Sequence, residues 1–567
     1  MATQRIKGTK ALLESLIMEG VDTIFGYPGG SIMPLYDELY DYTERLNHIL
    51  VRHEQGAVHA AEGYARSTGK VGVCMATAGP GATNFVTGIA DAMMDSTPLV
   101  CITAQVNTDK LGTNFFQEAD IISITLPITK WSYQVTKASE IPEVMAKAFY
   151  IAKSGRPGPV VISFTRNAQV ELFDYNYNRE EFIKEIVREN PKVNSEDLDK
   201  AAQMINEAEK PLIIAGHGVA IANAETKLQE LCEKANIPVA ATLMGLSTIS
   251  SQHKNYIGMV GMHGNVAPNN MTQEADLIIA VGMRFSDRVT GETKGYAPKA
   301  QIIHIDIDQS EFNKNIKANL PLRGDAGEVL TELNKRVEYV ERAEWFAFAQ
   351  EKKDSEFQKI FCPKLNSKEE ILMGQVISKI SEQTDSTAVV VTDVGQNQMF
   401  GARYSKFNNT RSWITSGGLG TMGFGLPAAI GAKVAHPEKD VIAIVGDGGF
   451  QMNIQELGTI MQSDIKVKIV LFNNSYLGMV RQWQELFFNR RYSFTHLVNP
   501  DFHQLVQAYG MKSNRITKVE EIDQAVNEML QADEAYLLEV MVKEEENVFP
   551  MIPAGATLDE ILFDKVN

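Results

Sequence analysis

The stretch IVGDGGFQMNIQELGTIMQSDIKVKIVLFNNSYLGMV, residues 444–480, decides the fold. It contains two apolar runs that read as buried strands, the first ending at Gly446-Asp447-Gly448 and the second at Asn473-Asn474. Between them, apolar residues at helical spacing predict a helix near residues 452–461. A strand, a helix and a second strand form a parallel pair whose carboxyl ends meet at one sheet edge. The sequence therefore places a carboxylate and an amide side by side at that edge.

Asp447 and Asn474 offer the oxygen ligands that Mg²⁺ prefers, and Mg²⁺ commonly bridges to phosphate oxygens. The N-terminus of the intervening helix adds backbone amides and a dipole that favour an anion. A Gly-Asp-Gly sequence alone is usually a turn, and an Asn pair alone is a weaker signal still. The two motifs together, each after a buried strand, predict a metal ion that holds a diphosphate.

The rest of the chain repeats this alternation of apolar strands and helical segments. Nine short runs read as buried strands, and most are followed by Gly, Asp or Asn: VGVCMAT, PLVCITA, PVVISF, PLIIAG, DLIIAVG, QIIHIDID, AVVVTDVG, DVIAIVGDG and KIVLFNN. Such runs are typical of parallel sheets covered by helices on both faces. We therefore predict the α/β class, with three doubly wound parallel-sheet domains.

Two segments lack this alternation and read as linkers, residues 171–194 and residues 345–367. The C-terminal tail holds two prolines and a glycine, and we expect it to pack over the functional site rather than join a sheet. The first and third domains could be distant copies of one architecture, which sequence identity does not establish. The predicted units are residues 1–170, 190–345 and 368–545, followed by the tail, 546–567.

Composition and charge narrow the class of protein. The 567 residues are 44% hydrophobic and 22% charged, values typical of soluble globular proteins. Because 71 acidic residues outnumber 54 basic ones, the net charge of −17 makes nucleic acid and anionic membranes poor partners. No stretch approaches the ~18 apolar residues of a membrane span, and the N-terminus lacks a signal or transit pattern. Neither a zinc site nor a disulfide framework fits the spacing of Cys74, Cys101, Cys232 and Cys362. We predict a cytoplasmic protein.

The two motifs together resemble the thiamine-diphosphate binding motif, in which Gly-Asp-Gly is followed about two dozen residues later by Asn-Asn. The resemblance implies that Mg²⁺ is bound by Asp447, by Asn474 and by the main-chain oxygen of Tyr476. The bound cofactor is bent by a bulky apolar side chain beneath its two rings. The segment SGGLGTMGFGLPAAIGA resembles that region, which implies that Met422 fills this role.

This family also needs one glutamate beside the aminopyrimidine ring of the cofactor. In HILVRHEQGAVHAAEGYARSTGK, Glu54 lies between a strand at residues 49–51 and a helix that starts at Gln55. On its own it could be a first-turn glutamate that the helix dipole favours. With the motif and the resemblance of RHEQGA to the activating segment, Glu54 is the expected catalytic carboxylate.

Further segments resemble the catalytic subunit of acetohydroxyacid synthase, in that family's order and over nearly the whole chain: FGYPGGSIMPLYDEL, ATAGPGATN, FFQEADI, SGRPGPVVI, TLMGLS, GMHGNVAPN, RFSDRVTG, HIDID, LGMVRQWQ and MIPAGATLDEIL. The resemblance implies decarboxylation of pyruvate and transfer of the hydroxyethyl unit to a second pyruvate or to 2-oxobutanoate. The products would be 2-acetolactate or 2-aceto-2-hydroxybutyrate, in the first step of valine, leucine and isoleucine biosynthesis. A catabolic acetolactate synthase, a pyruvate oxidase of the same architecture and an inactive thiamine-binding scaffold remain alternatives.

The resemblance also implies the residues of the site. Gln117 and Gly30 would face the reacting centre with Glu54, and the second-substrate pocket would contain Phe116, Met262, Arg284 and Trp483. Contacts to thiamine diphosphate are implied for Val394, Gly395, Gln396, Gly420, Met422, Gly446, Gly448, Leu477, Gly478, Met479 and Val480. FAD without a redox role is implied at Arg156, Gly216, Gly218, Thr242, Leu243, Met244, Met262, His263, Gly264, Arg284, Val289, Asp306 and Asp325. Each residue could instead have a purely structural role: Trp483 could be a core residue, Arg284 could form a surface ion pair, and the glycines could simply form turns.

Three positions depart from the family pattern. Ser163 and Arg166 stand where an Asp and a Lys near the channel entrance are usual, and Asn397 replaces a His that contacts the diphosphate. Asn can donate a hydrogen bond but cannot be cationic. RFSDRVTG and Trp483 favour the biosynthetic enzyme over the catabolic one. The resemblance further implies a homodimer or tetramer in which Glu54 faces the diphosphate domain of another chain, and a regulatory small subunit as a partner.

Overall fold

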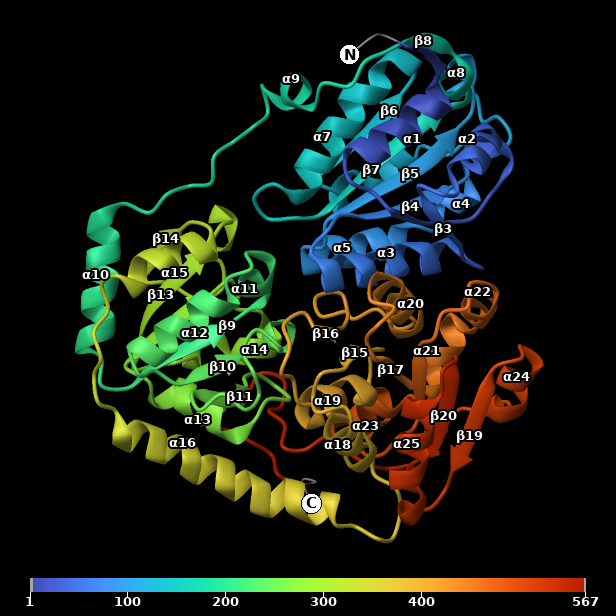
Figure 1. The fold of residues 1–567 in the computed structure, drawn as a ribbon. Coiled ribbons are helices and arrows are strands. Elements are labelled where there is room, and N and C mark those ends of the chain that lie inside the picture. Colours follow the sequence, from blue (N-terminus) through green and yellow to red (C-terminus); the bar gives the residue numbers. More distant parts are fainter. Residues whose placement is uncertain (1–3, 565–567) are drawn as a thin grey trace.

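A computed structural model describes residues 4–564 and contains three six-stranded sheets flanked by helices (Figure 1). All neighbouring strands in these three sheets are parallel. All nine predicted strands are present. The predicted α/β class with three parallel-sheet domains is confirmed, while the exact domain boundaries stay predictions. Within the described residues, none of the helices combines the length and the apolar character that a membrane crossing needs.

The first sheet has the order β3-β2-β4-β5-β7-β6. Its strands are β2 (Thr23–Gly26), β3 (Asn47–Leu50), β4 (Gly72–Ala76), β5 (Leu99–Gln105), β6 (Trp131–Val135) and β7 (Pro159–Thr165). One face packs against α1 and α7, and the other against α3 and α5 (Figure 1). The helices of this domain are α1 (Gly8–Met18), α2 (Met33–Leu39), α3 (Glu54–Thr68), α4 (Pro80–Thr83), α5 (Val86–Asp95), α6 (Ile121–Thr125), α7 (Ile141–Lys153) and α8 (Arg166–Val170).

The third sheet has the order β16-β15-β17-β18-β20-β19, which is the order of the first sheet with the strands renumbered. The two domains therefore share one topology, as the sequence suggested without establishing it. Its strands are β15 (Val389–Thr392), β16 (Trp413–Ile414), β17 (Val441–Gly446), β18 (Lys468–Asn473), β19 (Lys512–Ile516) and β20 (Tyr536–Met541). Its helices are α18 (Met373–Gln383), α19 (Gln396–Tyr404), α20 (Gly425–Ala435), α21 (Asp447–Met452), α22 (Leu457–Gln462), α23 (Gly478–Phe487), α24 (Phe502–Ala508) and α25 (Ile522–Gln531).

The central sheet has a different order, β11-β10-β9-β12-β13-β14. Numbered along the chain this is 3-2-1-4-5-6, the order of dinucleotide-binding sheets. Its strands are β9 (Pro211–Ala215), β10 (Val239–Ala241), β11 (Tyr256–Met259), β12 (Leu277–Val281), β13 (Gln301–Asp306) and β14 (Leu320–Arg323). The helices around it are α10 (Ser195–Glu207), α11 (His217–Ile221), α12 (Glu225–Lys234), α13 (Val266–Glu274), α14 (Asp287–Thr290) and α15 (Ala326–Asn334).

Both predicted linkers contain regular structure. In the first, β8 (Leu172–Tyr175) pairs antiparallel with β1 (Gln4–Lys7), and α9 (Arg179–Ile183) follows. In the second, α16 (Ala343–Glu356) continues through a π-helical turn into α17 (Cys362–Leu365). The buried carboxylate of Glu356 accepts a hydrogen bond from the Val266 backbone N–H at 3.0 Å. This second linker is therefore a helical strut against the central domain, which its polar sequence did not indicate.

Two local predictions are also corrected. The helix expected at residues 452–461 starts earlier, at Asp447, and is interrupted after Met452 before α22 begins. Asn453 lies at the break with φ −132°, and its Nδ2 donates to the Gly423 carbonyl at 2.7 Å, so a tertiary hydrogen bond ends α21. The strand expected at residues 49–51 is β3, and the next helix begins at Glu54 rather than one residue later.

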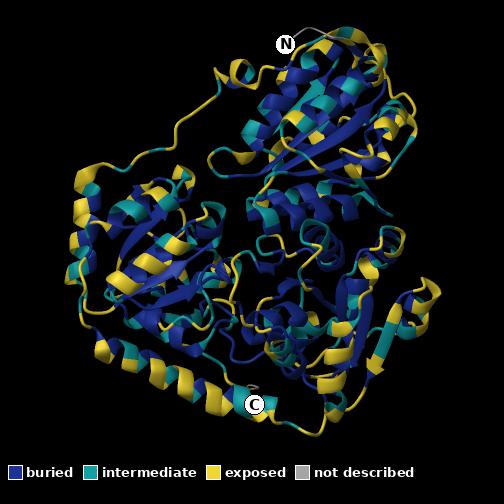
Figure 2. Ribbon diagram, viewed as in Figure 1, coloured by how far each residue is buried: buried dark blue, intermediate teal, exposed yellow. Residues whose placement is uncertain are grey.

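The first and third domains are joined where α3 crosses α20 (Figure 1). A Cβ atom on Gly63 would lie 1.9 Å from the Ala428 carbonyl oxygen, and one on Gly431 would lie 1.8 Å from the Ala60 carbonyl oxygen. Only glycine allows the two backbones to approach this closely. Side chains from both sheets meet there in one hydrophobic core, and Figure 2 shows this junction as buried.

We expect Gly63→Ala to lower the free energy of unfolding by ~1–3 kcal/mol or more, because the added methyl group must push α3 and α20 apart. Urea unfolding followed by far-UV circular dichroism measures this change. The matched control is Gly30→Ala, whose Cβ would have no neighbour within 4 Å and should change stability by less than ~0.5 kcal/mol. Equal stability of the two variants would contradict the predicted clash.

Candidate active site

Several of the predicted residues, among them Gly30, Gly216 and Asp447, follow strands at which the strand order of a sheet reverses. In such sheets, ligands bind beyond the carboxyl ends of the strands at the reversal. The reversal falls between β2 and β4 in the first sheet, between β9 and β12 in the central one, and between β15 and β17 in the third. Turns with two or more glycines follow β2, β9 and β17, and a single glycine, Gly282, follows β12. The three sheets therefore present three candidate binding edges.

The expected metal ligands meet at the edge of the third sheet. Asp447 is the first residue of α21 and is buried, and its Oδ2 accepts a hydrogen bond from Asn499 Nδ2 at 2.7 Å. Asn474 Oδ1 accepts from the Tyr476 N–H at 3.2 Å, which closes a tight turn after β18. Burial raises the pKa of Asp447 to about 6, and the hydrogen bond from Asn499 acts in the opposite direction. A carboxylate, an amide and a main-chain oxygen are a donor set that fits Mg²⁺.

Asn499 is a residue of this site that the sequence did not reveal. Its Nδ2 also donates to Asn473 Oδ1 at 3.0 Å, so it joins the two motifs. It lies 52 residues after Asp447, in a loop without a strand or glycine signal. Nothing in its local sequence could have identified it.

The predicted diphosphate contacts gather around these ligands. A Cβ on Gly448 would lie 2.7 Å from Leu477 Cδ2 and 3.6 Å from Met422 Cε. A Cβ on Gly478 would lie 2.2 Å from Gln396 Oε1. The glycines are therefore required for close packing at this edge, and Met422 lies beside the metal motif.

Asn397 does not have the role that the departure from the family pattern suggested. Its Nδ2 donates to the Asp393 carbonyl at 2.9 Å and to the Ile444 carbonyl at 3.0 Å. Both amide hydrogens are thus used to tie α19 to the ends of β15 and β17. Asn397 supports the edge from behind, and its side chain has no N–H left to donate to a diphosphate.

The segment that carries Met422 is folded around Asp393, which the sequence analysis also missed. The Asp393 carboxylate accepts backbone N–H bonds from Val394 at 2.7 Å and from Gly425 at 2.9 Å. Gly423 donates to both of its oxygens, at 3.1 and 3.0 Å. The only available sequence signal was an aspartate at the end of an apolar strand.

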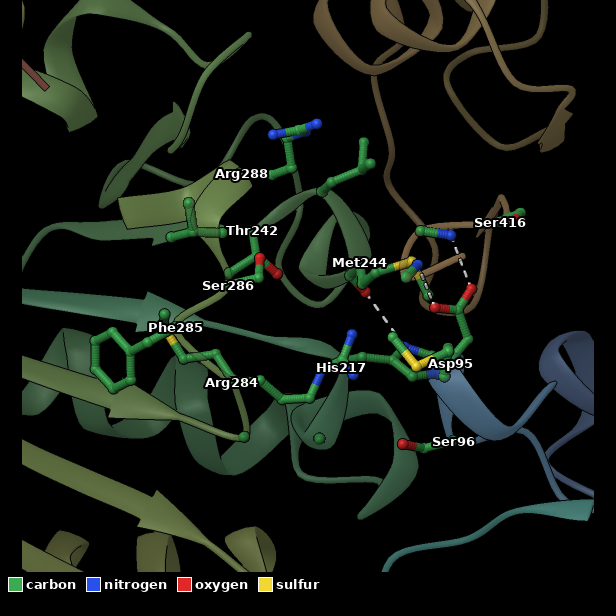
Figure 3. Close-up of a pocket in the computed structure, with 18 of the residues that line it drawn as sticks. Asp95, Ser96, His217, Thr242, Met244, Arg284, Phe285, Ser286, Arg288 and Ser416 are labelled. Atoms are coloured by element: carbon green, nitrogen blue, oxygen red, sulfur yellow. Dashed lines mark hydrogen bonds between the residues drawn. The ribbon is translucent and has the colours of Figure 1, made fainter. Parts of the chain in front are cut away.

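One cavity of about 630 Å³ opens between the central and third domains (Figure 3). Met94, Asp95 and Ser96 at the end of α5 contribute to its wall, so all three domains line it. Eighteen of the predicted residues line this cavity: Arg156, Gly218, Thr242, Leu243, Met244, Met262, His263, Arg284, Val289, Asp306, Asp325, Val394, Gly395, Gly420, Met422, Met479, Val480 and Trp483. The structure thus joins the predicted flavin, acceptor and thiazolium contacts in a single space.

Gly216 and Gly264 do not line the cavity. A Cβ on Gly216 would lie 2.2 Å from the Gly282 carbonyl oxygen, and one on Gly264 would lie 2.4 Å from the Met259 carbonyl oxygen. These two glycines are needed because backbone segments approach closely behind the wall.

Charged side chains of both signs line the central-domain end of the cavity: Arg284 and Arg288, and with them Asp287, Asp306 and Asp325. Arg284 reaches into it, and within residues 4–564 no carboxylate pairs with this guanidinium (Figure 3). His217, which the sequence analysis did not select, donates its Nδ1–H to the Met244 carbonyl at 3.2 Å. Burial, then Arg66 and Arg411, lower the pKa of His217 to about 3, so its imidazole is neutral. The cavity can therefore hold an anionic group beside Arg284.

Four predicted residues lie on the first domain, away from this cavity. Glu54 is fixed by Asn84, whose Nδ2 donates to its Oε2 at 2.8 Å. Gln117 has φ 61° and packs on Gly79, while Gly30 accepts at its carbonyl from Arg166 at 3.4 Å. Phe116 is 82% exposed. Within one chain, none of Glu54, Gly30, Gln117 and Phe116 lines the cavity.

Ser163 stands where the family pattern has an aspartate. It lies inside β7 and is fully buried, so it cannot contact a ligand at an entrance. The tail packs against the central and third domains, while its predicted position over the functional site stays a prediction. The Ile552 N–H donates to the Met262 carbonyl at 2.8 Å, and the Val548 N–H donates to Gln482 Oε1 at 2.9 Å. The tail therefore braces α23, the helix that carries Trp483.

Models of known protein families match each of the three domains. Residues 6–124 match the N-terminal TPP binding domain of thiamine pyrophosphate enzymes, residues 198–333 match their central domain, and residues 393–540 match their C-terminal TPP binding domain. The matches follow the order of the three sheets.

Curated relatives match over nearly the full length. The acetolactate synthase isozyme 2 large subunit of Escherichia coli K12 is 44% identical over 98% of this chain and 99% of its own. A probable acetolactate synthase large subunit of Methanocaldococcus jannaschii is 45% identical, covering 98% and 95%. The acetolactate synthase large subunit of Lactococcus lactis is 43% identical, covering 98% and 96%. The chain therefore belongs to the acetolactate synthase large subunits, a family of thiamine-pyrophosphate-dependent enzymes.

Proposed function

We propose that this chain is a biosynthetic acetohydroxyacid synthase that uses pyruvate as donor and either pyruvate or 2-oxobutanoate as acceptor. Thiamine diphosphate with Mg²⁺ would occupy the edge of the third sheet, and FAD the central-domain end of the cavity. The observation that carries the proposal is the single cavity, in which Met422, Arg284 and Trp483 share one space. That arrangement supports a reaction in which a second substrate meets the cofactor.

The residues present fit the two cofactors. Asp447 is a buried carboxylate whose raised pKa reflects desolvation, and a cation would offset that cost. The central domain has the strand order of dinucleotide-binding folds, and its cavity walls combine guanidinium groups with methionines. Asp306 lines the cavity at the end of β13, with a pKa raised to about 6 by burial. An amphiphilic, anionic dinucleotide fits these walls.

When bound, thiamine diphosphate supplies the nucleophilic carbon and the electron sink for decarboxylation. Met422 would support the bent cofactor from below, and Glu54, oriented by Asn84, would hold a proton beside the aminopyrimidine. Arg284, which has no carboxylate partner within the described residues, would bind the carboxylate of the acceptor. Trp483 would provide an apolar wall for the extra methyl group of 2-oxobutanoate and exclude water.

The position of Glu54 supports a site shared between two copies of the chain. Glu54 and Gln117 lie on the first domain and do not reach the cavity of the same chain, and Phe116 is exposed beside them. In a dimer, this edge of one copy would face Met422 and Asp447 of the other. A regulatory small subunit is a further proposal, supported by relatives that are named as large subunits.

The acetolactate synthase alternatives differ in the acceptor pocket. Residues 284–289 of the RFSDRVTG segment line the cavity, as does Trp483. Both features support the biosynthetic enzyme over a catabolic one. Incubation of the protein with pyruvate, thiamine diphosphate, Mg²⁺ and FAD should yield 2-acetolactate, and oxygen consumption with acetate formation would instead identify a pyruvate oxidase.

We expect Glu54→Gln to slow decarboxylation of pyruvate by ~10²–10⁴-fold, because the amide cannot exchange a proton with the cofactor. Release of CO₂ from pyruvate, with bound thiamine diphosphate quantified in the same sample, measures this. Glu344→Gln, an exposed substitution on α16, should match the parent. A Glu54→Gln protein that is fully loaded with thiamine diphosphate and decarboxylates pyruvate at the parent's rate would disprove the assigned role.

We expect Trp483→Leu to shift the products toward 2-acetolactate, because the apolar wall that would contact the extra methyl group of 2-oxobutanoate is lost. The ratio of 2-aceto-2-hydroxybutyrate to 2-acetolactate, measured at equal concentrations of pyruvate and 2-oxobutanoate, should fall by ~10–200-fold. Phe488→Leu is the matched control, because Phe488 is exposed at the end of the same helix and does not line the cavity. An unchanged ratio in Trp483→Leu would remove this residue from the specificity pocket.

A mixing experiment tests the shared site. Glu54→Gln and Asp447→Ala chains, each inactive alone, are co-expressed with different affinity tags. If the site spans two copies, a mixed dimer has one intact site, and random mixing should recover about a quarter of the parental activity. Doubly tagged dimers without activity would place Glu54 and Asp447 in the same chain's site.

A further inference from the structure

A buried group of titratable side chains lies where α3 and α5 meet the segment 415–424. His59 and Glu62 come from α3 and Asp91 from α5, and all three are fully buried. One ligand atom of each lies within 4.8 Å of those of the other two. His59 Nδ1 and Glu62 Oε1 are 2.9 Å apart. The proposed reaction does not use this group.

Two oxygens in the group lack a hydrogen-bond donor. Asp91 Oδ1 accepts from the hydroxyls of Ser416 and Thr421, the latter at 3.0 Å, and Glu62 Oε1 faces His59. Among the described residues, Glu62 Oε2 and Asp91 Oδ2 have no partner, although both are buried. Buried carboxylate oxygens without a donor are costly, so each is expected to have one. A single hydrogen between the two carboxyl groups would satisfy both.

The charges around the group also call for a proton. Glu62, Asp91 and Asp95 are three buried carboxyls, and the cation among them is Arg66, whose Nη1 lies 3.5 Å from Asp95 Oδ2. Burial lowers the pKa of His59, so it is neutral, and Asp393 on the third domain adds a further negative charge nearby. Burial and the neighbouring carboxylates raise the pKa of both Glu62 and Asp91. One guanidinium cannot balance three carboxylates.

We propose that Glu62 and Asp91 share one proton, and that this acid–carboxylate pair positions the segment 415–422 of the third domain. Neutral His59 donates its Nδ1–H to Glu62 Oε1, and the shared hydrogen lies between Glu62 Oε2 and Asp91 Oδ2. Asp91 Oδ1 is then free to accept from both hydroxyls of the segment. The proton is retained and takes no part in turnover, so these are positioning residues.

The segment held in this way forms part of the cavity wall. Ser416 and Gly420 line the cavity, and Met422 follows two residues later. Asp95, one turn after Asp91, accepts the backbone N–H groups of Gly417 at 2.8 Å and Gly418 at 2.7 Å (Figure 3). Helix α5 of the first domain thereby fixes the segment that would support the bent cofactor.

The shared proton should make the contribution of this pair to stability decrease as pH rises. Because folding raises the pKa of the pair, the full contribution of the pair to the free energy of unfolding is present below the unfolded carboxyl pKa of about 4. It is lost as pH rises through the folded value, since the folded state retains a proton that the unfolded state has released. Glu62→Gln has a permanent N–H donor in place of this proton, so the loss should vanish.

The first experiment uses the full-length protein without cofactors. At neutral pH, infrared spectra should show the C=O band of a buried protonated carboxyl group that shifts in D₂O. Glu62→Gln should remove this band, and Glu344→Gln, on exposed α16, should retain it. The difference in Tm between Glu62→Gln and the parent should grow between about pH 5 and about pH 8. A band that persists in Glu62→Gln, or a pH-independent difference in Tm, would overturn the proposal.

A metal ion on the same three side chains is the competing outcome. Elemental analysis of the purified protein that finds a stoichiometric metal, absent from Glu62→Gln, would overturn proton sharing. If Glu62→Gln fails to fold, Asp91→Asn replaces it, because its Nδ2 can donate to Glu62 while its Oδ1 still accepts from Ser416 and Thr421. It should likewise remove the infrared band.

The second experiment tests positioning through titration with thiamine diphosphate and Mg²⁺. Glu62→Ala should weaken binding by about tenfold or more, and Glu62→Gln should restore most of this loss. Equal weakening by both would overturn the positioning role. This arm rests on the proposed cofactor site, whereas the infrared and thermal measurements do not. Failure of the cofactor assignment would therefore abolish binding in the parent but leave the carboxyl band unchanged.

Discussion

The close contact of α3 with α20 is the constraint on which the rest of the arrangement depends. Gly63 and Gly431 let the two backbones approach until carbonyl oxygens of one helix occupy the space of a side chain on the other. The core that surrounds them contains residues of both the first and the third sheet. The two domains therefore behave as one packed unit, and this fixes where α5 lies relative to the third domain.

The shape of the cavity wall depends on that contact. Helix α5 ends at Asp95, and its carboxylates hold the segment 415–422 through backbone amides and hydroxyls. On the other side of the same segment, Asp393 gathers the amides of Gly423 and Gly425. The segment that carries Met422 is thus held between buried carboxyl groups of two domains. Hydrogen bonds to charged groups are stronger than neutral ones, which suits a loop that must keep a fixed shape.

Several parts of this architecture could be predicted from local sequence. Buried parallel strands are continuous apolar runs, so their number and class were readable, and the turns after β17 and β18 indicated the edge at which a metal ion is proposed. The break after α21 was not readable, because the Asn453 hydrogen bond to Gly423 is made 30 residues away. Asn499 was hidden for the same reason, because its partners Asp447 and Asn473 lie far from it in the sequence. The inward role of Asn397 in α19 was hidden because one of its two acceptors, the Ile444 carbonyl, lies 47 residues away.

The sequence by itself determined the α/β class, the oxygen chemistry of the proposed metal ligands and the resemblance that names the candidate residues. These depend on residue type and on spacings of a few dozen residues, which chain connectivity preserves. Only the tertiary structure decided which of those residues share a space: Arg284, Trp483 and Met422 do, whereas Glu54 and Phe116 lie on another edge. The tertiary structure alone also showed that Glu62 and Asp91 meet in the interior. Those relations depend on how helices from different domains pack, and packing is set by complementary shape across the whole chain rather than by any one segment.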